Sequence, residues 1–391
     1  MRDADPLSLL ARSGAGDAFY YEVPDADFAL VGLGVAESVE AEGAERFARV
    51  QGELRDRGGD ALWVGGFGFA DRSSDADFPA ARWWRPQRLW ARRGDACWGD
   101  PLPAAAPAPR SPADVAPAPQ ELPGDDALYR ERVLRALDAI GRGELEKVVV
   151  ARALDLRRSE PIDPVSLLRR LRARHTACAL YAVKRGDCWF VGATPERLLR
   201  REDGRFEAMA LAGSARRGRS EAEDERLGRR LVESKKEQSE HAVAVRELRQ
   251  ALERSGATLQ VPESPELLRL SGLQHLCSRI GAHWPGAAPG LLEIAGRVHP
   301  TAAVCGAPVA SARDWLARHE GLERGWYAGL VGWLGRGGEG ELSAALRCAR
   351  LEGGRARVFA GAGIVAGSDP DAEVRETRLK WNALLPALQG P

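Results

Sequence analysis

The chain has 391 residues, of which 44% are hydrophobic and 29% are charged, so it can bury a sizeable core and is globular rather than disordered. Its 56 Lys and Arg residues balance 56 Asp and Glu residues. The zero net charge disfavours a nucleic-acid binder, because neutralising phosphates requires a basic excess. This length accommodates two or three average domains or one large α/β fold.

No export or membrane signal is evident. The first residues, MRDADPLSLLARSGAG, lack a sustained apolar segment, and no run reaches the roughly 18 apolar residues of a membrane span. The six cysteines are scattered without Cys-x-x-Cys spacing, which is typical of free thiols in a reducing compartment. We therefore expect a cytoplasmic protein that does not bind membranes.

Composition divides the chain into three parts. Residues 1–100 contain two apolar, β-like segments at 28–35 and 61–70. Residues 101–124 are rich in Pro and Ala, and we expect an extended linker that forms no β-ladder. Residues 125–391 alternate between helical and strand patterns, which indicates an α/β or α+β enzyme body.

The first elements of this body follow from their periodicity. Apolar spacing predicts a helix that begins near 127 and stops at the glycines of 141–143. A strand follows over 147–156, and then a helix over 164–175. Residues 178–193 predict a β-hairpin that turns at Arg185-Gly186-Asp187.

The later elements are marked by caps and turns. Ser220 and Glu223 predict a capping box that opens one long helix, which Gly256 closes. Two strands joined at Gly353-Gly354 lead into a glycine-rich turn. Asp369-Pro370 then opens a final helix that extends to about Leu388.

Two glutamate pairs recur at helical spacing. Glu237 and Glu240 are three residues apart in the long helix, and Glu373 and Glu376 repeat this arrangement in the final helix, with Lys380 one turn further on. Each pair alone is typical of a solvated helix face. If the two pairs faced each other, the carboxylates would require a cation, and hard oxygen ligands suit Mg²⁺.

Other residues are weaker candidates taken singly. Gly361 and Gly363 precede a helix and could cradle an anion, although a tight structural turn explains them as well. Lys147 opens an apolar strand, where burial favours the neutral amine. Glu196 follows a proline, and 210–220 reads as a small-residue loop with a solvated or anion-binding role. The sequence contains no zinc motif, Walker loop or dinucleotide fingerprint.

Read in order, these segments resemble the chorismate-utilising enzymes, from Asp125 to the end of the chain. The resemblance implies an α/β (α+β) fold in which two packed β-sheets form a sandwich with outer helices and a deep central cleft, and which the N-terminal strands join. The matching segments are KVVVAR (147–152), FVGATPERLL (190–199), ALAGSARRG (210–218), ESKKEQSEH (233–241), LQHL (273–276), HPTAAVCGAP (299–308), ERGWYAGLVGW (323–333), ALRCA (345–349) and GAGIVAGSDPDAEVRET (361–377).

Within this family the chain is most similar to isochorismate synthases of the menaquinone type. Lys147 stands where the ammonia-using enzymes have Gln, and Ala212 stands where aminodeoxychorismate synthases have a nucleophilic Lys. The loop PTAAVCG also resembles the isochorismate synthase version. Salicylate synthase, which goes on to eliminate pyruvate, remains an alternative, followed by component I of anthranilate or aminodeoxychorismate synthase.

The resemblance implies a Mg²⁺-dependent isomerase that converts chorismate to isochorismate by attack of water at carbon 2 and loss of the carbon 4 hydroxyl. Lys147 is the implied base, Glu196 the implied acid, and His299 the implied orienting residue. Glu240 and Glu376 would bind the metal directly, and Glu237 and Glu373 through water. The implied substrate-binding residues are Gly213, Ser214, Tyr327, Arg347, Gly361, Gly363 and Lys380.

The resemblance implies no amidotransferase subunit, and we expect a monomer or weak homodimer. The product could serve menaquinone, siderophore or salicylate biosynthesis, which the sequence leaves open. Two alternatives outside the family are a Mg²⁺-dependent phosphotransferase or phosphatase built on the four glutamates, and a non-catalytic binding protein.

Overall fold

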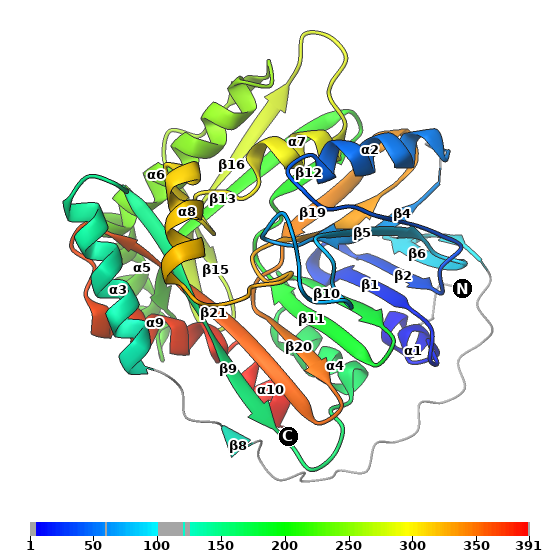
Figure 1. Ribbon diagram of the computed structural model, residues 1–391, viewed down its shortest axis with the longest axis horizontal. Coiled ribbons are helices and arrows are strands. Elements are labelled where there is room, and N and C mark those ends of the chain that lie inside the picture. The colour runs from blue at the N-terminus through cyan, green and yellow to red at the C-terminus, as the bar shows by residue number, and fades with distance from the viewer. Residues whose placement is uncertain (1–4, 59–60, 101–119, 122–125, 390–391) are drawn as a thin grey trace.

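The computed structural model describes residues 5–58, 61–100, 120–121 and 126–389 (Figure 1). Two large antiparallel sheets carry most of the strands, and the helices lie along their outer faces. This arrangement confirms the predicted fold class.

The larger sheet, with eleven strands, contains two long strands, β9 and β21, paired along their whole length from Lys147↔Val365 to Arg157↔Arg355. In spatial order its strands are β17 (Gly306–Ala307), β9 (Lys147–Arg157), β21 (Arg355–Val365), β20 (Cys348–Glu352), β11 (Cys188–Thr194), β10 (Ala179–Arg185), β1 (Ala18–Val23), β2 (Phe28–Leu33), β6 (Arg88–Arg93) and β7 (Ala96–Gly99), with β8 (Gln120–Glu121) paired to β9.

The second sheet, with ten strands, is built around β13 and β16. Its order is β14 (Thr258–Gln260), β16 (Leu273–His283), β13 (Arg205–Arg216), β12 (Leu199–Glu202), β19 (Gly340–Ala344), β18 (Leu330–Leu334), β4 (Trp63–Phe67), β5 (Ala81–Arg85) and β3 (Glu37–Glu40), with β15 (Glu266–Arg269) paired to β16.

The α-helices are α1 (Pro6–Leu10), α2 (Arg46–Asp56), α3 (Asp126–Gly141), α4 (Pro164–Arg174), α5 (Glu221–Glu233), α6 (Lys235–Glu253), α7 (Leu291–Val298), α8 (Val309–His319), α9 (Pro370–Trp381) and α10 (Leu385–Gln389). Two short 3₁₀ turns are η1 (Pro24–Ala26) and η2 (Arg336–Gly338). In the described part of the chain, no helix combines the length and the apolar character that crossing a membrane requires.

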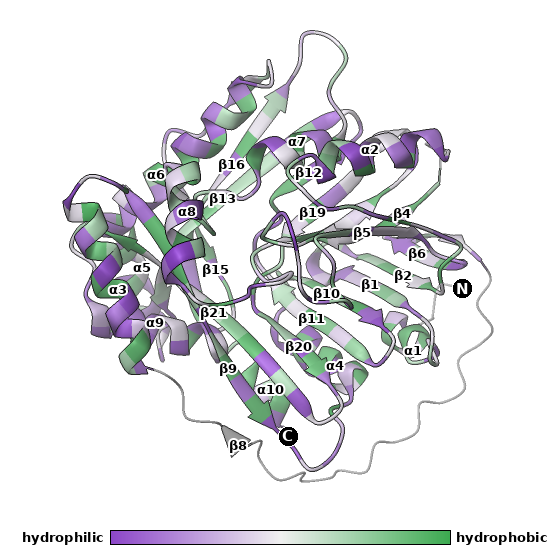
Figure 2. Ribbon diagram, in the orientation of Figure 1, coloured by the Kyte–Doolittle hydropathy of each residue, from purple (hydrophilic) through white to green (hydrophobic). Residues whose placement is uncertain are grey.

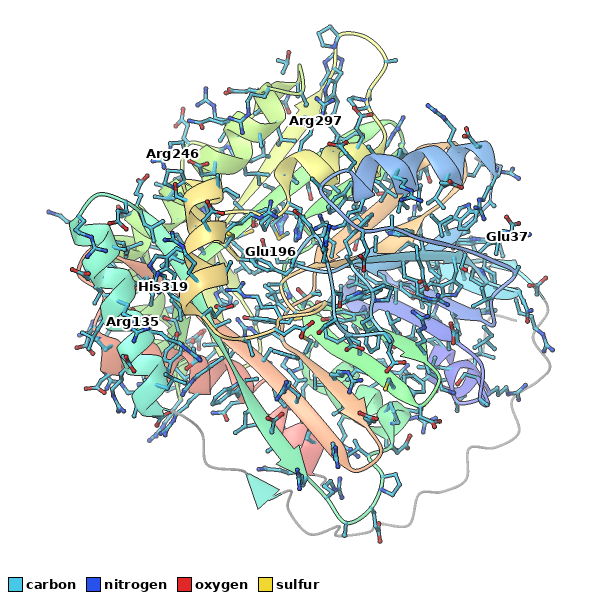
Figure 3. All side chains as sticks on the ribbon, in the orientation of Figure 1. Glu37, Arg135, Glu196, Arg246, Arg297 and His319 are labelled. Carbon is cyan, nitrogen blue, oxygen red and sulfur yellow. The ribbon has the colours of Figure 1, made fainter. Side chains whose placement is uncertain are left out.

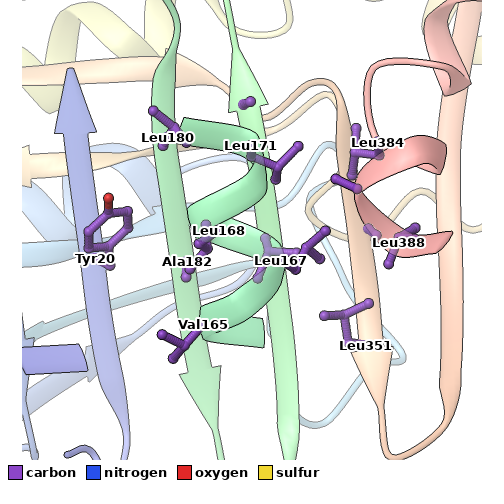
Figure 4. Packing of buried hydrophobic residues seen from close by; sticks show 14 of the residues in the cluster. Tyr20, Val165, Leu167, Leu168, Leu171, Leu180, Ala182, Leu351, Leu384 and Leu388 are labelled. Carbon is purple, nitrogen blue, oxygen red and sulfur yellow. The ribbon is translucent and has the colours of Figure 1, made fainter. Parts of the chain in front are cut away.

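Three apolar layers hold the sheets and helices together. Between the sheets, aromatic side chains from both form a continuous core that includes Tyr181, Phe190 and Trp333. Outside the larger sheet, α4 packs its leucines on β10 and against the C-terminal helix (Figure 4). Outside the second sheet, α2 and α7 cover a separate apolar cluster. Figure 2 shows the complementary pattern, with hydrophilic residues on the outer helices and apolar residues concentrated along many of the strands.

Strands from the first hundred residues lie in both sheets. The segments expected at 28–35 and 61–70 contain β2 and β4, so both strand predictions are confirmed. β1 pairs with β10, and β4 pairs with β18. The predicted linker, 101–124, falls outside the described residues except for β8, whose pairing with β9 contradicts the expectation that this segment forms no ladder.

Turn and capping residues in the sequence predicted several elements correctly. α3 ends at Gly141, the β10–β11 hairpin turns at Gly186-Asp187, and β20 and β21 are joined at Gly353-Gly354. Asp369 caps α9 by accepting a hydrogen bond from Ala372 N.

Two helix predictions were wrong in extent. The expected single helix is divided into α5 and α6, because Ser234 adopts an extended conformation and its hydroxyl caps the N-terminus of α6. The final helix stops at Trp381, and the short α10 follows.

Two glycine-containing segments were also misassigned. The loop expected over 210–220 is mostly strand, because β13 continues to Arg216, and Gly361 and Gly363 lie inside β21 rather than in a turn. Pairing with buried neighbours on both sides overrides the weak β-propensity of Gly and Ala.

Candidate active site

One cavity lies where β9, β21, β13 and α6 come together, near the middle of the molecule, and Figure 3 shows Glu196 in this central region. The cavity is small, about 60 Å³. Predicted site residues that line it are Glu196, Gly213, Ser214, Glu240, Tyr327, Arg347, Gly361, Gly363 and Lys380. Segments that are distant in sequence therefore contribute to a single site.

Glu196 is buried in the loop between β11 and β12. Its backbone is fixed at both ends, because its N–H donates to Thr194 Oγ1 at 3.2 Å and its carbonyl accepts from Ala344 N at 2.9 Å. The side chain is 2% exposed, and its Oε1 has no hydrogen-bond partner among the described residues. Burial raises the pKa of Glu196 to about 8, although the cationic Lys147 and Arg347 act in the opposite direction. The carboxyl group therefore keeps its proton at neutral pH and can donate it.

Lys147 opens β9 and is completely buried. Its Nζ lies 3.2 Å from Glu240 Oε1, yet the ammonium has no well-oriented hydrogen bond to any described residue. Gly363 of β21 leaves the room for this contact. A Cβ atom at Gly363 would overlap the Glu240 carboxylate and come within 3.0 Å of Lys147 Cε. The site thus places an amine with unused hydrogen-bonding capacity beside the cavity.

The four predicted metal ligands lie on two helices, α6 and α9. Lysine side chains form ion pairs with their carboxylates. Lys236 Nζ is 2.9 Å from Glu373 Oε1 and 3.5 Å from Glu237 Oε1, so it joins the two helices. Lys380 Nζ is 2.7 Å from Glu376 Oε1. Within the described ranges, no three side chains of His, Cys, Asp or Glu converge as ligands of one metal ion would.

The carboxylates nevertheless influence one another. Burial and then the charge of Glu240 raise the pKa of Glu237, and burial and then the charge of Glu376 raise the pKa of Glu373. Burial alone would also raise the pKa of Glu376, but Lys380 and neighbouring cations hold it below its usual value. Mutual repulsion of this kind is relieved by added positive charge.

The donor set fits a hard divalent cation. Glu373 Oε2 is buried and has no hydrogen-bond partner in the described chain. Gly213 leaves space beside a second glutamate, since a Cβ there would lie 3.2 Å from Glu237 Oε2. Carboxylate oxygens with space for water are the ligands that Mg²⁺ takes.

A β-bulge supplies backbone donors at the same end of the cavity. The register of β13 against β16 shifts between Ala212 and Ser214, and the intervening Gly213 has φ = +76°, a conformation that favours glycine. The bulge directs Ser214 N toward Glu237 Oε2, at 3.1 Å.

Arg347 and His275 form a polar pair on the cavity wall. Arg347 Nη2 lies 3.2 Å from His275 Nε2, and His275 Nδ1 lies 3.1 Å from the carbonyl of Gly213 and 3.0 Å from Ser214 Oγ. Burial, and then the charge of Arg347, lower the pKa of His275 well below its usual value. Because arginine can only donate, Nε2 accepts and the proton lies on Nδ1, which donates to Gly213.

His275 was not among the predicted site residues. The segment LQHL carried the only sequence signal for it, because strand alternation places every second side chain of β16 on one face. Arg347 itself has φ = +47°, which is rare outside glycine and is typical of functional sites.

Tyr327 and the glycines of β21 shape the opposite wall. The Tyr327 ring stacks on Phe359 with centroids 5.1 Å apart and an interplanar angle of 9°. A Cβ at Gly361 would lie 2.9 Å from Tyr327 Oη, so this glycine makes room for the hydroxyl. Lys380 Nζ donates to the Gly361 carbonyl at 2.8 Å. A hydroxyl, an ammonium and a guanidinium therefore surround this end of the cavity.

His299 is not among the residues that line the cavity, so its orienting role stays a prediction. It ends α7 and packs between Phe47 and Phe69, with ring centroids at 5.7 and 6.4 Å. Burial, and then the charge of Arg46, lower its pKa to about 3. The residues that follow it, Ala303 and Val304, line the cavity instead.

Comparisons with known proteins agree with this geometry. Residues 104–389 match the protein family described as "Chorismate binding enzyme". The salicylate biosynthesis isochorismate synthase of Pseudomonas aeruginosa is 35% identical over 429 aligned residues, which cover 99% of this chain and 89% of that protein. Isochorismate synthase EntC of Escherichia coli K12 is 35% identical over 262 residues, covering 67% of each chain.

Solved structures show the same fold. MenF, the menaquinone-specific isochorismate synthase from Escherichia coli, superposes with a TM-score of 0.84 at 28% identity, covering 99% of this chain and 92% of that one. Anthranilate synthase component I from Streptococcus pneumoniae superposes with a TM-score of 0.76 over 93% of both chains. At 20% identity, this second likeness concerns the fold alone.

Proposed function

The chain belongs to the chorismate-binding enzyme family, and from this premise we propose that it is an isochorismate synthase. The observation that carries the proposal is a buried protonated carboxyl group, Glu196, on the wall of one small cavity, together with a buried amine, Lys147, that contacts the cavity-lining Glu240. An amine that accepts a proton and a carboxyl that donates one are what exchange of a hydroxyl group for water requires.

The reaction adds water at carbon 2 of chorismate and removes the hydroxyl of carbon 4. Lys147, in its neutral form, accepts a proton from the attacking water, and Glu196 gives its proton to the departing hydroxyl, which leaves as water. Atoms balance, so the product is an isomer of the substrate. Proton transfers of this kind each accelerate a reaction by about 10²–10⁴-fold.

Cationic and hydroxyl groups would bind the substrate carboxylates. The Arg347 guanidinium can bind a carboxylate in bidentate fashion. The same guanidinium donates a hydrogen bond to His275. Tyr327 and Lys380 meet at Gly361 and supply further donors. These donors would offset the negative charge of a bound dianion.

The backbone also contributes to this recognition. The bulge at Gly213 and Ser214 turns the Ser214 N–H toward the Glu237 carboxylate, which it helps to position. Gly363, by lacking a side chain, leaves the space in which Lys147 and Glu240 face the substrate.

The four glutamates fit a divalent cation, and we assign Mg²⁺ to them. Glu240 and Glu376 would bind it directly, and Glu237 and Glu373 through water. When bound, Mg²⁺ supplies positive charge that holds a substrate carboxylate. Around it, Lys236 and Lys380 continue to neutralise the glutamate oxygens that the cation leaves free.

Water, rather than ammonia, would be the nucleophile. Lys147 occupies the start of β9 and Ala212 has no amine to offer from β13, so we infer that no amidotransferase subunit is required. All six cysteines are free thiols, as in a reducing compartment, and we infer a cytoplasmic enzyme that acts as a monomer or weak homodimer.

The test is an incubation of purified protein with chorismate and Mg²⁺, followed by chromatographic and mass-spectrometric product analysis. We expect isochorismate, no pyruvate, and no additional aromatic product when ammonium is present. Salicylate together with pyruvate would identify a salicylate synthase instead. Anthranilate formed from added ammonia would contradict the assignment of Lys147.

A further inference from the structure

One edge of β9 is paired with the short strands β17 and β8 near its two ends, and between them side chains take the place of a strand. The short β17 pairs only with Lys147 and Val148, and Val149 N then donates to Cys305 O at 2.8 Å. Beyond this point the ladder has no further residue of β17. Glu320 Oε1 accepts the Ala151 N–H at 2.7 Å, and Arg324 Nη2 donates to the Val149 carbonyl at 2.7 Å.

Glu320 and Arg324 form a buried ion pair while they make these contacts. Two hydrogen bonds of 2.7 and 2.6 Å join the guanidinium to the carboxylate, and the two residues are 3% and 4% exposed. The guanidinium also packs on the ring of Phe69, 4.2 Å from its centroid. Both side chains are therefore held in one conformation.

The pair touches three segments of the cavity wall at once. Val149 and Val304 both line the cavity, and Arg324 donates to the carbonyl oxygens of both, at 2.7 and 2.8 Å. The carbonyl of Arg324 accepts from Tyr327 N at 2.9 Å. The buried pair thus joins the strand of Lys147, the loop after His299 and the turn that carries Tyr327.

Stability alone is a poor explanation for such a pair. Desolvating two charges costs about as much as their attraction returns, and apolar replacements of similar volume are often neutral or stabilising. What an apolar pair cannot supply is a set of directional bonds to Ala151, Val149 and Val304. Catalysis depends on such directional placement, because a displacement of about 1 Å can cost roughly 10²-fold in rate.

We propose that Glu320 and Arg324 are positioning residues that complete the edge of β9 and thereby fix Lys147 relative to Tyr327 and Val304. Neither residue touches the reacting atoms. The inference rests on the proposed function for its kinetic consequences, while the strand contacts themselves are independent of it.

The principal test compares Glu320→Gln with Glu22→Gln. Glu22 is a matched control, since it is a buried carboxylate 3.7 Å from Arg172 and lies on β1, away from the cavity. We expect Glu320→Gln to lower kcat for isochorismate formation at least 30-fold with less than a threefold change in KM. Glu22→Gln should lose thermal stability without this effect on kcat.

A double variant, Glu320→Leu/Arg324→Met, guards against a misfolded single variant, because it removes both charges and leaves neither unpaired. It should fold and still lose kcat at least 30-fold. Wild-type kcat in the folded double variant, or equal kinetic effects in Glu320→Gln and Glu22→Gln, would overturn the proposal.

Hydrogen–deuterium exchange separates this proposal from the proposed function. We expect the amides of residues 149–151 to lose protection in Glu320→Gln and to keep it in Glu22→Gln. Should the wild-type protein form no isochorismate, the proposed function fails, and exchange alone decides the positioning role. Unchanged protection of 149–151 would then overturn it.

Discussion

Lys147 Nζ lies 3.2 Å from Glu240 Oε1, across the gap that Gly363 leaves open in β21. The proposed base and a proposed metal ligand are therefore electrostatic partners. A change at either residue is therefore expected to disturb the position of the other.

Replacing Lys147 should remove the base without closing the cavity. Lys147→Gln keeps a polar end on a side chain that is one atom shorter, and we expect kcat for isochorismate formation to fall by about 10²–10⁴-fold. Chorismate binding, measured by quenching of tryptophan fluorescence, should change much less. Lys235→Gln, an exposed lysine of α6, is the control and should have wild-type kcat. A fully active Lys147→Gln variant would exclude lysine as the base.

Glu196 should impose an upper pH limit on the rate. Its folded-state pKa of about 8 is above the usual value of 4.5, so the carboxyl is protonated below pH 8 and becomes an unreactive carboxylate above it. The rate of isochorismate formation should therefore decrease as pH rises through about 8. Glu196→Gln should lose about 10²–10⁴-fold in kcat and lack this basic limb. A wild-type profile that stays flat to pH 10 would contradict the assigned acid.

The glutamates should fall into two classes when magnesium is titrated. EDTA should abolish isochorismate formation and Mg²⁺ should restore it. Glu240→Gln and Glu376→Gln should raise the half-saturating Mg²⁺ concentration by more than about 100-fold, whereas Glu237→Gln and Glu373→Gln should raise it about 10–100-fold. Calorimetric titration without chorismate provides a readout independent of turnover. Equal effects at all four positions would reject the division into direct and water-mediated ligands.

A single methyl group at Gly363 should inactivate the enzyme. The added Cβ would overlap the Glu240 carboxylate and press on Lys147 Cε, so Gly363→Ala should lower kcat/KM at least 100-fold and weaken Mg²⁺ binding in calorimetry. Gly141→Ala is the matched substitution, since nothing lies within 4 Å of a Cβ there, and it should leave both quantities unchanged. Normal Mg²⁺ affinity in Gly363→Ala would show that the crowding is relieved by movement.

Arg347 should contribute mainly to substrate binding. Arg347→Lys keeps the charge but loses the planar fork, and losing one charge-assisted hydrogen bond costs about 1.5–3 kcal/mol. This loss of binding free energy corresponds to a rise of about 10–100-fold in KM for chorismate. We expect a smaller decrease in kcat. Arg350→Lys is the control, because Arg350 pairs with Asp75 and Glu352 outside the cavity. Unchanged KM in Arg347→Lys would show that the guanidinium does not bind the substrate.

Local chemistry explains which elements the sequence predicted correctly. The β10–β11 hairpin depends on a two-residue turn at Gly186-Asp187, and α9 depends on the cap at Asp369. Both signals act within a few residues, so the turn and the cap form whatever the surrounding tertiary structure. The break at Ser234 was missed because helical periodicity continues across it, and only the competing cap reveals that a second helix begins.

His275 and His299 show what sequence patterns leave undetermined at the site. Sequence resemblance gave a role to His299 and none to His275, which the structure places on the cavity wall beside Arg347. The difference arises because His299 ends a helix and is turned toward Phe47, while the alternation of β16 directs His275 to the bulge at Gly213. Side-chain direction is set by the packed neighbours, which a linear pattern does not record.

The sequence by itself determined the class of fold, the spacing of each glutamate pair, and the identity of the acid and base candidates, because these depend on composition, helical periodicity and motif resemblance. The tertiary structure alone decided which residues meet. It brought Lys147 against Glu240, bridged α6 to α9 through Lys236, and completed the edge of β9 with Glu320 and Arg324. Such contacts join residues far apart in the chain, and burial, strand register and charge pairing fix them only when the sheets and helices have packed.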